Sequence, residues 1–146
     1  MSIQNAIELP SVRFLILDLH RSVLNIWFNR PKARNALNNE MMSELVQVLD
    51  SIKCDRTIRT IVLRGKGGFF CAGGDIKDFK SGMQASDSNE VAKGNRSFGD
   101  VMTKLNEQPQ VVIILVEGAA VGGGLGLACV ADVTPVSYTH LRAHET

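Results

Sequence analysis

Two stretches of sequence decide the fold: residues 58–75, IRTIVLRGKGGFFCAGGD, and residues 111–124, VVIILVEGAAVGGG. Each begins with an apolar run of strand length, Ile58 to Leu63 in the first and Val111 to Val116 in the second, and then becomes rich in glycine. The second run is apolar on both faces, which predicts a strand in a sheet covered from both sides. Two such strand–glycine units in one chain predict an α/β protein.

Helices are expected after each glycine segment, starting near Ile76 and near Gly123, the latter buried. Upstream, Arg13 to His20 and Val23 to Phe28 are expected to form a hairpin. Asn38 or Asn39 then caps a helix. The apolar residues of that helix recur at helical spacing: Met41, Met42, Leu45, Val48, Leu49 and Ile52.

A second long helix is expected between the two strand–glycine units. The polar segment Ser81 to Asn89 predicts a surface loop before this helix, and Pro109 ends it. The apolar face of the helix consists of Val91, Phe98, Val101, Met102 and Leu105. The predicted order after the hairpin is therefore helix, strand, helix, strand, helix.

The amino-acid composition argues against several classes of function. The chain has 146 residues, 45% hydrophobic and 21% charged, with 16 Lys and Arg against 15 Asp and Glu and a net charge of +1. These values predict one globular domain and argue against a strongly basic nucleic-acid binder. No apolar run is long enough for a membrane span, and Met1 to Glu8 lacks the features of a secretory signal, so we expect a cytoplasmic protein with no membrane or nucleic-acid partner. Cys54, Cys71 and Cys129 form no CxxC pair, which favours reduced thiols over a disulfide framework or a metal site.

The glycines have a chemical use where a strand leads into a helix. Glycine lets the backbone turn sharply and bring its N–H groups close to a ligand, and a helix N-terminus adds unpaired donors. If Gly74 and Gly123 aim one N–H each at the same point, they form an oxyanion hole. The alternative is that the glycines only permit tight turns and close helix–sheet packing.

A dinucleotide site is a rival interpretation of the second segment. A G-x-G-x-x-G pattern begun at Gly122 or Gly124 would need glycine at Leu127 or Cys129, so the spacing fails. The phosphate-loop pattern GxxxxGK[ST] is also absent. Both observations argue against a nucleotide-binding protein.

Three segments resemble the N-terminal signatures of the crotonase, or enoyl-CoA hydratase/isomerase, superfamily: NRPKARNAL at 29–37, FCAGGDI at 70–76 and VEGAAVGGG at 116–124. They occur in the family's order and at suitable spacing, over a resemblance that runs from about Val12 to Val133. The resemblance implies a crotonase-like ββα spiral fold, truncated before the C-terminal helical trimerisation region. We therefore expect residues 1–133 to form an incomplete N-terminal core.

The last residues differ from the rest. Pro135 to Thr146 shows neither a helical nor a strand period, so we expect residues 134–146 to be a tail that does not belong to the family. The resemblance implies a homotrimer or homohexamer for the full-length parent and an inactive truncated chain.

The resemblance also implies roles for individual positions. Gly74 and Gly123 would supply the two N–H groups that hold the thioester oxygen of an acyl-CoA and stabilise its enolate. Lys32 and Ala33 would border the CoA moiety. The pantetheine and phosphate path would be lined by Ala72, Asp75, Ile76 and Lys77. No metal and no separate cofactor are implied, because coenzyme A is part of the substrate.

This chain departs from the family pattern at the acids. In relatives that add water with two glutamates, the first lies three residues after the second glycine of the GGG run, where this chain has Gly126. The second would lie beyond Val133, so the general acid–base pair cannot be assigned to this chain. Glu117 and Asp132 are expected to be structural, at a strand end and a helix end.

For three further residues we favour a role outside catalysis. Asp75 is suited to capping the helix that follows it rather than acting as a base. Cys71 has no histidine near it in sequence to activate a thiolate. His20 is expected to end a strand in solvent.

The favoured function is an enzyme whose parent hydrates an unsaturated acyl-CoA thioester. The run from Gly126 to Cys129 is most similar to hydratases of branched glutaconyl-type thioesters. Isomerase, hydrolase or decarboxylase chemistry stays open, because the family changes its acids while keeping its oxyanion hole. A non-catalytic acyl-CoA binder is a second class of function, and a nucleotide binder is a third and less favoured one.

Overall fold

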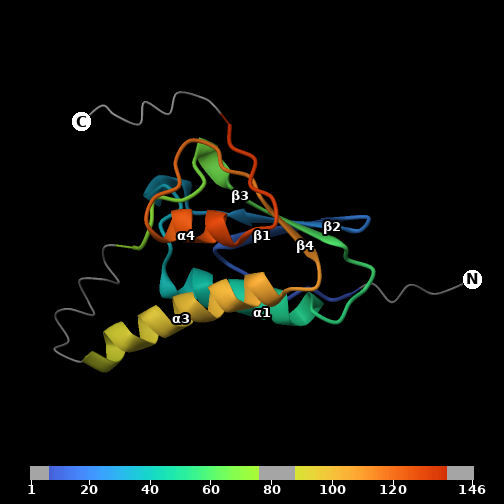
Figure 1. Cartoon of the computed structure of the whole chain (residues 1–146), viewed down its shortest axis with the longest axis horizontal. Helices are drawn as coiled ribbons and strands as arrows, with labels where there is room; N and C mark the ends of the chain where they lie inside the picture. The colour runs from blue at the N-terminus through green and yellow to red at the C-terminus, as the bar shows by residue number, and fades with distance from the viewer. Residues whose placement is uncertain (1–6, 76–87, 138–146) are drawn as a thin grey trace, which may run out of the picture.

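The computed structural model describes the backbone of residues 7–75 and 88–137, with side chains described at 7–75 and 96–137. Four strands form one sheet in the order β1–β2–β3–β4 (Figure 1). The strands are β1 (Leu15–His20), β2 (Val23–Phe28), β3 (Thr60–Gly65) and β4 (Val111–Ile114). β1 and β2 form the predicted antiparallel hairpin, whereas β2, β3 and β4 run parallel and therefore end at the same edge.

Two long helices make the crossovers between the parallel strands. These two helices are α1 (Asn39–Ile52) and α3 (Ser88–Glu107). A shorter helix, α4 (Gly123–Val130), follows β4, and the short 3-10 turns are η1 (Pro31–Ala33) and η2 (Lys66–Gly68). α1 and α3 pack against each other on one face of the sheet, and α4 follows β4 at the opposite side of α3 from α1 (Figure 1). Among the described residues, no helix combines the length and apolar character needed to cross a bilayer.

α1 forms where its capping residue and apolar spacing predict it. Asn38 is extended and its side chain accepts a hydrogen bond from the Met41 N–H over 2.7 Å, which confirms it as the N-cap. The carboxylate of Glu40 lies in the first turn, where the helix dipole favours it. All six predicted apolar side chains are buried, each contributing about 1.5–3 kcal/mol relative to exposure.

β3 and β4 differ from their predictions. β3 begins at Thr60 rather than Ile58, although Ile58 is still buried. β4 ends at Ile114, and it buries Val112 and Ile114 while Val111 is 46% exposed. Ile113, on the same face of β4 as Val111, is half-buried, so within the described residues this second face is only partly covered, less than expected. Burial of an apolar strand depends on what packs against it, which its own residues do not encode.

α4 and the segment after it also differ from expectation. α4 was expected to be buried, but its Leu125 is 55% exposed. Beyond α4, the Val116 N–H donates to the Pro135 carbonyl over 3.0 Å and the Ser137 N–H donates to the Val116 carbonyl over 2.9 Å. Residues 135–137 thus pair with the continuation of β4, where the sequence showed no strand period, because these bonds use only the backbone. The division of the chain at residue 133 stays a prediction.

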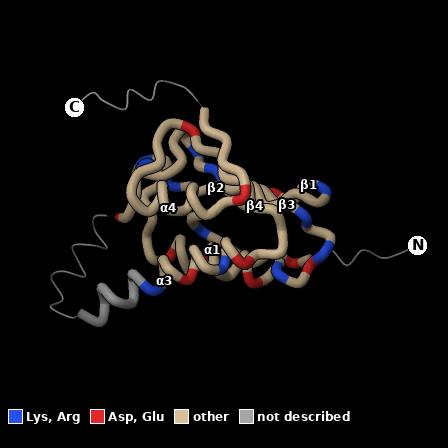
Figure 2. The backbone as a smooth tube through the Cα atoms, in the orientation of Figure 1, with Lys and Arg blue, Asp and Glu red and all other residues tan. Residues whose placement is uncertain are grey.

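The two long helices differ in their charged residues. The charged residues of α1 are all acidic, Glu40, Glu44 and Asp50, whereas the described part of α3 also carries Arg96 and Lys104 (Figure 2). An ion pair joins the two helices, since Lys104 of α3 donates a hydrogen bond to Asp50 of α1 over 2.7 Å. His20 ends β1 and is exposed, as predicted.

Candidate active site

The first signature segment, residues 29–37, is held in an unusual backbone path by one buried amide. Arg34 and Asn35 both have positive φ, at 50° and 57°. Asn35 tolerates this left-handed region better than most residues, and its side chain is fully buried. Its Oδ1 accepts from the Arg30 N–H over 2.9 Å, and its Nδ2 donates to the carbonyls of Lys66 (2.9 Å) and Phe69 (2.7 Å). The amide therefore ties this segment to the turn that precedes the second signature.

The second signature, residues 70–75, lies between the first and the third. On one side the Leu37 N–H donates to the Gly73 carbonyl over 2.7 Å, and the Asp75 N–H donates to the Leu37 carbonyl over 2.9 Å. On the other side the Cys71 N–H donates to the Ala119 carbonyl, and the Val121 N–H donates to the Cys71 carbonyl, both over 3.1 Å. Three segments that are far apart in sequence thus run side by side in parallel. They lie beyond the carboxyl ends of β2, β3 and β4, where ligands bind in many open α/β sheets.

Two glycines let the second and third segments approach each other. Gly73 has φ of 100°, and a Cβ there would lie 3.2 Å from the Val121 carbonyl oxygen. Gly122, the N-cap of α4, has φ of 53°, and a Cβ there would lie 3.9 Å from the Gly73 Cα. Side chains would be strained at both positions. The residues that follow them, Gly74 and Gly123, therefore lie on adjacent segments.

Gly74 and Gly123 are the two predicted donors. The neighbouring N–H groups are used, since Asp75 donates to Leu37 and Gly124 donates to Val121. Within the described part of the chain, neither Gly74 nor Gly123 donates to a backbone carbonyl outside the helices. Gly123 is the first residue of α4, where the N–H has no intrahelical partner.

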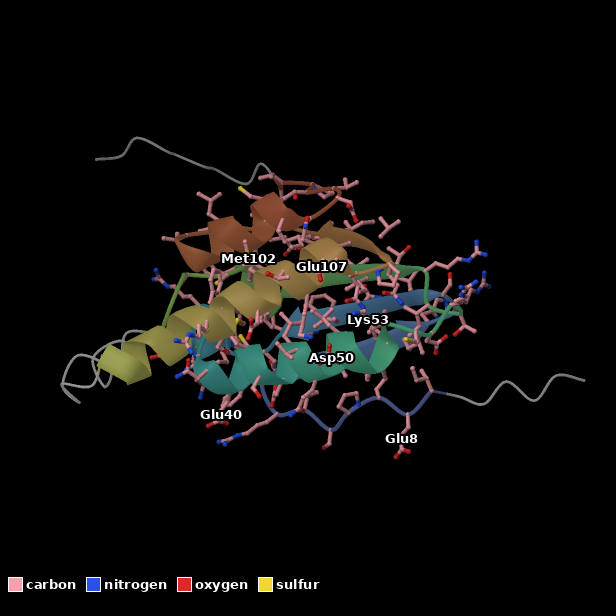
Figure 3. All side chains as sticks on the ribbon, turned by 60° about the horizontal axis from the view of Figure 1, so that its bottom comes forward. Glu8, Glu40, Asp50, Lys53, Met102 and Glu107 are labelled. Atoms are coloured by element: carbon pink, nitrogen blue, oxygen red, sulfur yellow. The ribbon has the colours of Figure 1, made fainter. Side chains whose placement is uncertain are left out.

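The two glycines differ in how closely other side chains surround them. A Cβ at Gly74 would meet no atom of the described residues within 4 Å. A Cβ at Gly123 would lie 3.2 Å from the Phe98 ring and 3.3 Å from Leu37. Figure 3 shows Met102 on the side of α3 toward α4, and a Cβ at Gly126 would lie 3.6 Å from its terminal methyl. α3 therefore supplies an apolar wall beside the start of α4, which the sequence did not predict.

The remaining predicted ligand contacts lie around these segments. Lys32 and Ala33 form the exposed turn η1, and Ala72 is exposed beside Gly73. Ile76 and Lys77 lie outside the described residues, as does the start of the helix expected there.

Asp75 is mostly buried and its carboxylate pairs with Arg30. The Nη2 of Arg30 donates to Oδ2 over 2.8 Å. Arg30 belongs to the first signature, but the sequence carries no signal for this pairing because the two residues are 45 positions apart.

The other acids have structural contacts, as predicted. Glu117 pairs with Arg64 over 3.3 Å, next to the end of β4. The carboxylate of Asp132 accepts from the Val112 N–H over 2.8 Å, so it satisfies a β4 donor from beyond the end of α4.

Cys71 is not set up as a nucleophile. Burial raises the pKa of its thiol from 9.0 to about 11, opposed by a hydrogen bond from the Gly73 N–H. The thiol is fully buried, and a protonated, buried thiol is inert near neutral pH. A hollow of about 480 Å³, lined by Lys53, Arg59 and Gln110 among others, lies at the amino ends of β3 and β4, away from the glycines.

Comparisons with known proteins identify the fold. The sequence model of the enoyl-CoA hydratase/isomerase family matches residues 18–139. A probable enoyl-CoA hydratase of Bacillus subtilis (strain 168) is 36% identical over 119 residues, which cover 82% of this chain and 44% of that protein. The mitochondrial Delta(3,5)-Delta(2,4)-dienoyl-CoA isomerase of Homo sapiens is 30% identical over 125 residues, which cover 81% of this chain and 38% of that protein. The solved structure of Pseudomonas aeruginosa AtuE superposes with a TM-score of 0.83 at 44% identity, covering 86% of this chain and 48% of that chain.

The fold is thus the crotonase-like α/β fold that the sequence predicted. The chain belongs to the enoyl-CoA hydratase/isomerase family. It spans less than half the length of these three relatives.

Proposed function

We propose that Gly74 and Gly123 form an oxyanion hole that holds the carbonyl oxygen of an acyl-CoA thioester. The observation that carries the proposal is the close approach of the Gly73 and Gly122 turns, which sets on adjacent segments two N–H groups that bond no backbone carbonyl outside the helices among the described residues. Two donors aimed at one oxygen stabilise the negative charge that develops when a thioester becomes an enolate. Removing one such donor from a working enzyme costs about 10²–10³ in kcat.

The chemistry that follows enolate formation depends on where protons are moved. The described side chains nearest to Gly126 are Phe98 and Met102, and neither carries a carboxylate. We propose hydration of an enoyl-CoA for the parent protein, which the similarity to a probable enoyl-CoA hydratase supports. The proton-transfer group would then not be residue 126, which is a glycine in this chain. Isomerisation of the double bond is the alternative, and it is supported by the similarity to a dienoyl-CoA isomerase. For this chain alone we propose acyl-CoA binding and carbonyl polarisation without turnover.

The CoA moiety would extend from the hole along exposed residues. Lys32 and Ala33 on η1, with Ala72, Asp75, Ile76 and Lys77, are the proposed border of that path. Because the ligand brings its own coenzyme A, no further cofactor is part of the proposal. A homotrimeric or homohexameric parent and a cytoplasmic location stay predictions; the three relatives named above are two bacterial proteins and one mitochondrial protein.

The test uses cinnamoyl-CoA, whose conjugated thioester absorbs at longer wavelength when its carbonyl oxygen accepts hydrogen bonds. Binding to this chain is expected to shift the absorption maximum to longer wavelength, and CoA alone competes for the site. Gly74→Pro removes one donor and should abolish most of the shift. Gly123→Pro removes the other at the first position of a helix, where proline is tolerated.

Alanine variants provide matched controls, because they add a Cβ but keep the N–H. Gly74→Ala meets no atom of the described residues within 4 Å and should retain the shift in full. Gly123→Ala adds a Cβ close to the flexible ends of Phe98 and Leu37 and should retain most of it. Circular dichroism verifies that each variant is folded. A bound thioester without any shift in the unmodified chain, or equal shifts in the folded alanine and proline variants, would refute the oxyanion hole.

A further inference from the structure

Arg30 connects two of the three segments that surround the glycines. Its guanidinium donates to the Asp75 carboxylate over 2.8 Å and to the Ala36 carbonyl over 2.5 Å. The guanidinium carbon also lies 5.6 Å from the centroid of the Phe14 ring. One side chain thus holds the first signature by its carbonyl and the second by its carboxylate.

The Arg30–Asp75 pair differs from the other ion pairs of the described residues in its burial. Its side chains are 19% and 11% exposed, whereas those of Arg13 and Glu40 are 77% and 68% exposed. An exposed pair contributes little, because water screens it. Breaking a mostly buried pair leaves one charge without compensation and disturbs its surroundings.

The two acceptors of Arg30 flank the backbone that holds Gly74. Asp75 directly follows Gly74, and Ala36 directly precedes Leu37, whose N–H and carbonyl bond the Gly73 carbonyl and the Asp75 N–H. The Gly74 peptide therefore lies between two backbone hydrogen bonds to Leu37. Arg30 thus bonds both segments of this pairing, one on each side of Gly74.

Arg30 also determines the charge beside Gly74. The Asp75 carboxylate is one residue away, and removing the positive charge of Arg30 would strengthen its opposition to negative charge on an oxygen held by the Gly74 N–H. The guanidinium opposes that charge at 2.8 Å, and none of its atoms lies within 4 Å of a Cβ placed at Gly74.

We infer that Arg30 is a positioning residue for the oxyanion hole, acting through Asp75 and Ala36 on the Gly74 N–H and touching no ligand itself. The inference rests on the proposed function of Gly74. It predicts that loss of the guanidinium weakens carbonyl polarisation more than it weakens binding of the CoA moiety.

The experiment measures two quantities on the whole chain: the absorption shift of bound cinnamoyl-CoA and the Kd of CoA alone. Arg30→Gln removes the positive charge and should lower the shift at least twofold while changing the Kd of CoA less than threefold. Arg30→Lys keeps the charge but cannot reach both acceptors with a planar fork, so an intermediate shift is expected. The double variant Arg30→Gln with Asp75→Asn removes both charges and should recover part of the shift.

Arg13→Gln is the matched control. Arg13 also stacks on Phe14, at 4.9 Å, but its ion pair is exposed and distant in sequence from Gly74. This variant should leave the shift unchanged. If Arg30→Gln is unfolded by circular dichroism, the comparison of Arg30→Lys with Arg13→Gln replaces it.

The outcomes separate the inference from the proposal on which it rests. No shift in the unmodified chain overturns both. A shift in the unmodified chain that Arg30→Gln and Arg30→Lys retain in full, or that Arg13→Gln loses equally, overturns the role of Arg30 and leaves the oxyanion hole intact. A selective loss of shift with the Kd of CoA preserved supports it.

Discussion

Replacing Asn35 by alanine should destabilise the chain more than any substitution on its surface. The side chain is fully buried and makes three hydrogen bonds, to the Arg30 N–H and to the carbonyls of Lys66 and Phe69. Each is worth about 0.5–1.5 kcal/mol net, and more when its partner is left buried and unpaired. Alanine at φ of 57° adds about 1 kcal/mol of backbone strain. We expect a loss of about 3–5 kcal/mol, a large part of the 5–15 kcal/mol typical of a domain.

Two further variants divide this loss into its causes. Asn35→Gly loses the same hydrogen bonds without the left-handed strain and should be about 1 kcal/mol more stable than Asn35→Ala. Asn35→Asp keeps an acceptor for the Arg30 N–H but places a carboxylate against two carbonyl oxygens, so it should be at least as unstable as Asn35→Ala. Urea unfolding followed by Trp27 fluorescence and circular dichroism gives the free energies. A loss below about 1 kcal/mol for Asn35→Ala, or no advantage of glycine over alanine, would refute the role of the buried amide.

Two other predictions concern α4 and the cysteine beside it. Gly126→Ala should raise the free energy of unfolding by about 0.5–1 kcal/mol, because its Cβ makes only ordinary contacts with Met102 and Phe98 and alanine favours a helix. Gly124→Ala should lower the free energy of unfolding, because its Cβ would lie 2.7 Å from the Cys71 Cβ. Thermal unfolding that ranks the two variants in the opposite order would contradict this packing. The Cys71 pKa is raised from 9.0 to about 11, so the folded state keeps a proton that the unfolded state releases, and the free energy of unfolding should fall between pH 9 and 11. Cys71→Ala should remove that slope in urea titrations, and an unchanged slope would show that other groups cause it.

The parts of the fold that the sequence predicted are those decided by local chemistry. The Asn38 cap and the buried stripe of α1 follow from side-chain type and spacing over a few residues. The extent of burial of β4 and α4 was mispredicted, since Val111 and Leu125 are apolar yet about half exposed. An apolar side chain favours burial, but whether it is buried depends on which distant parts of the chain pack against it.

The candidate site shows the same division. Gly74 and Gly123 could be singled out because a strand–glycine–helix order has a recognisable pattern. The pairing of Arg30 with Asp75 spans 45 positions and the amide of Asn35 reaches 31 and 34 positions along the chain, and no short-range pattern predicts such contacts. The roles of Lys32 and Ala33 stay predictions.

The hydrogen bonds between the three signature segments are made mainly by peptide groups, in the pairs Ala72 to Arg34, Leu37 with Gly73 and Asp75, and Cys71 with Ala119 and Val121. Alanine scanning changes side chains and keeps every one of these amides, so such a scan would register Asn35 and Arg30 and pass over the rest of the network. Replacing single amides by esters removes one donor at a time without adding atoms. A site built from main-chain groups must therefore be mapped by editing the main chain.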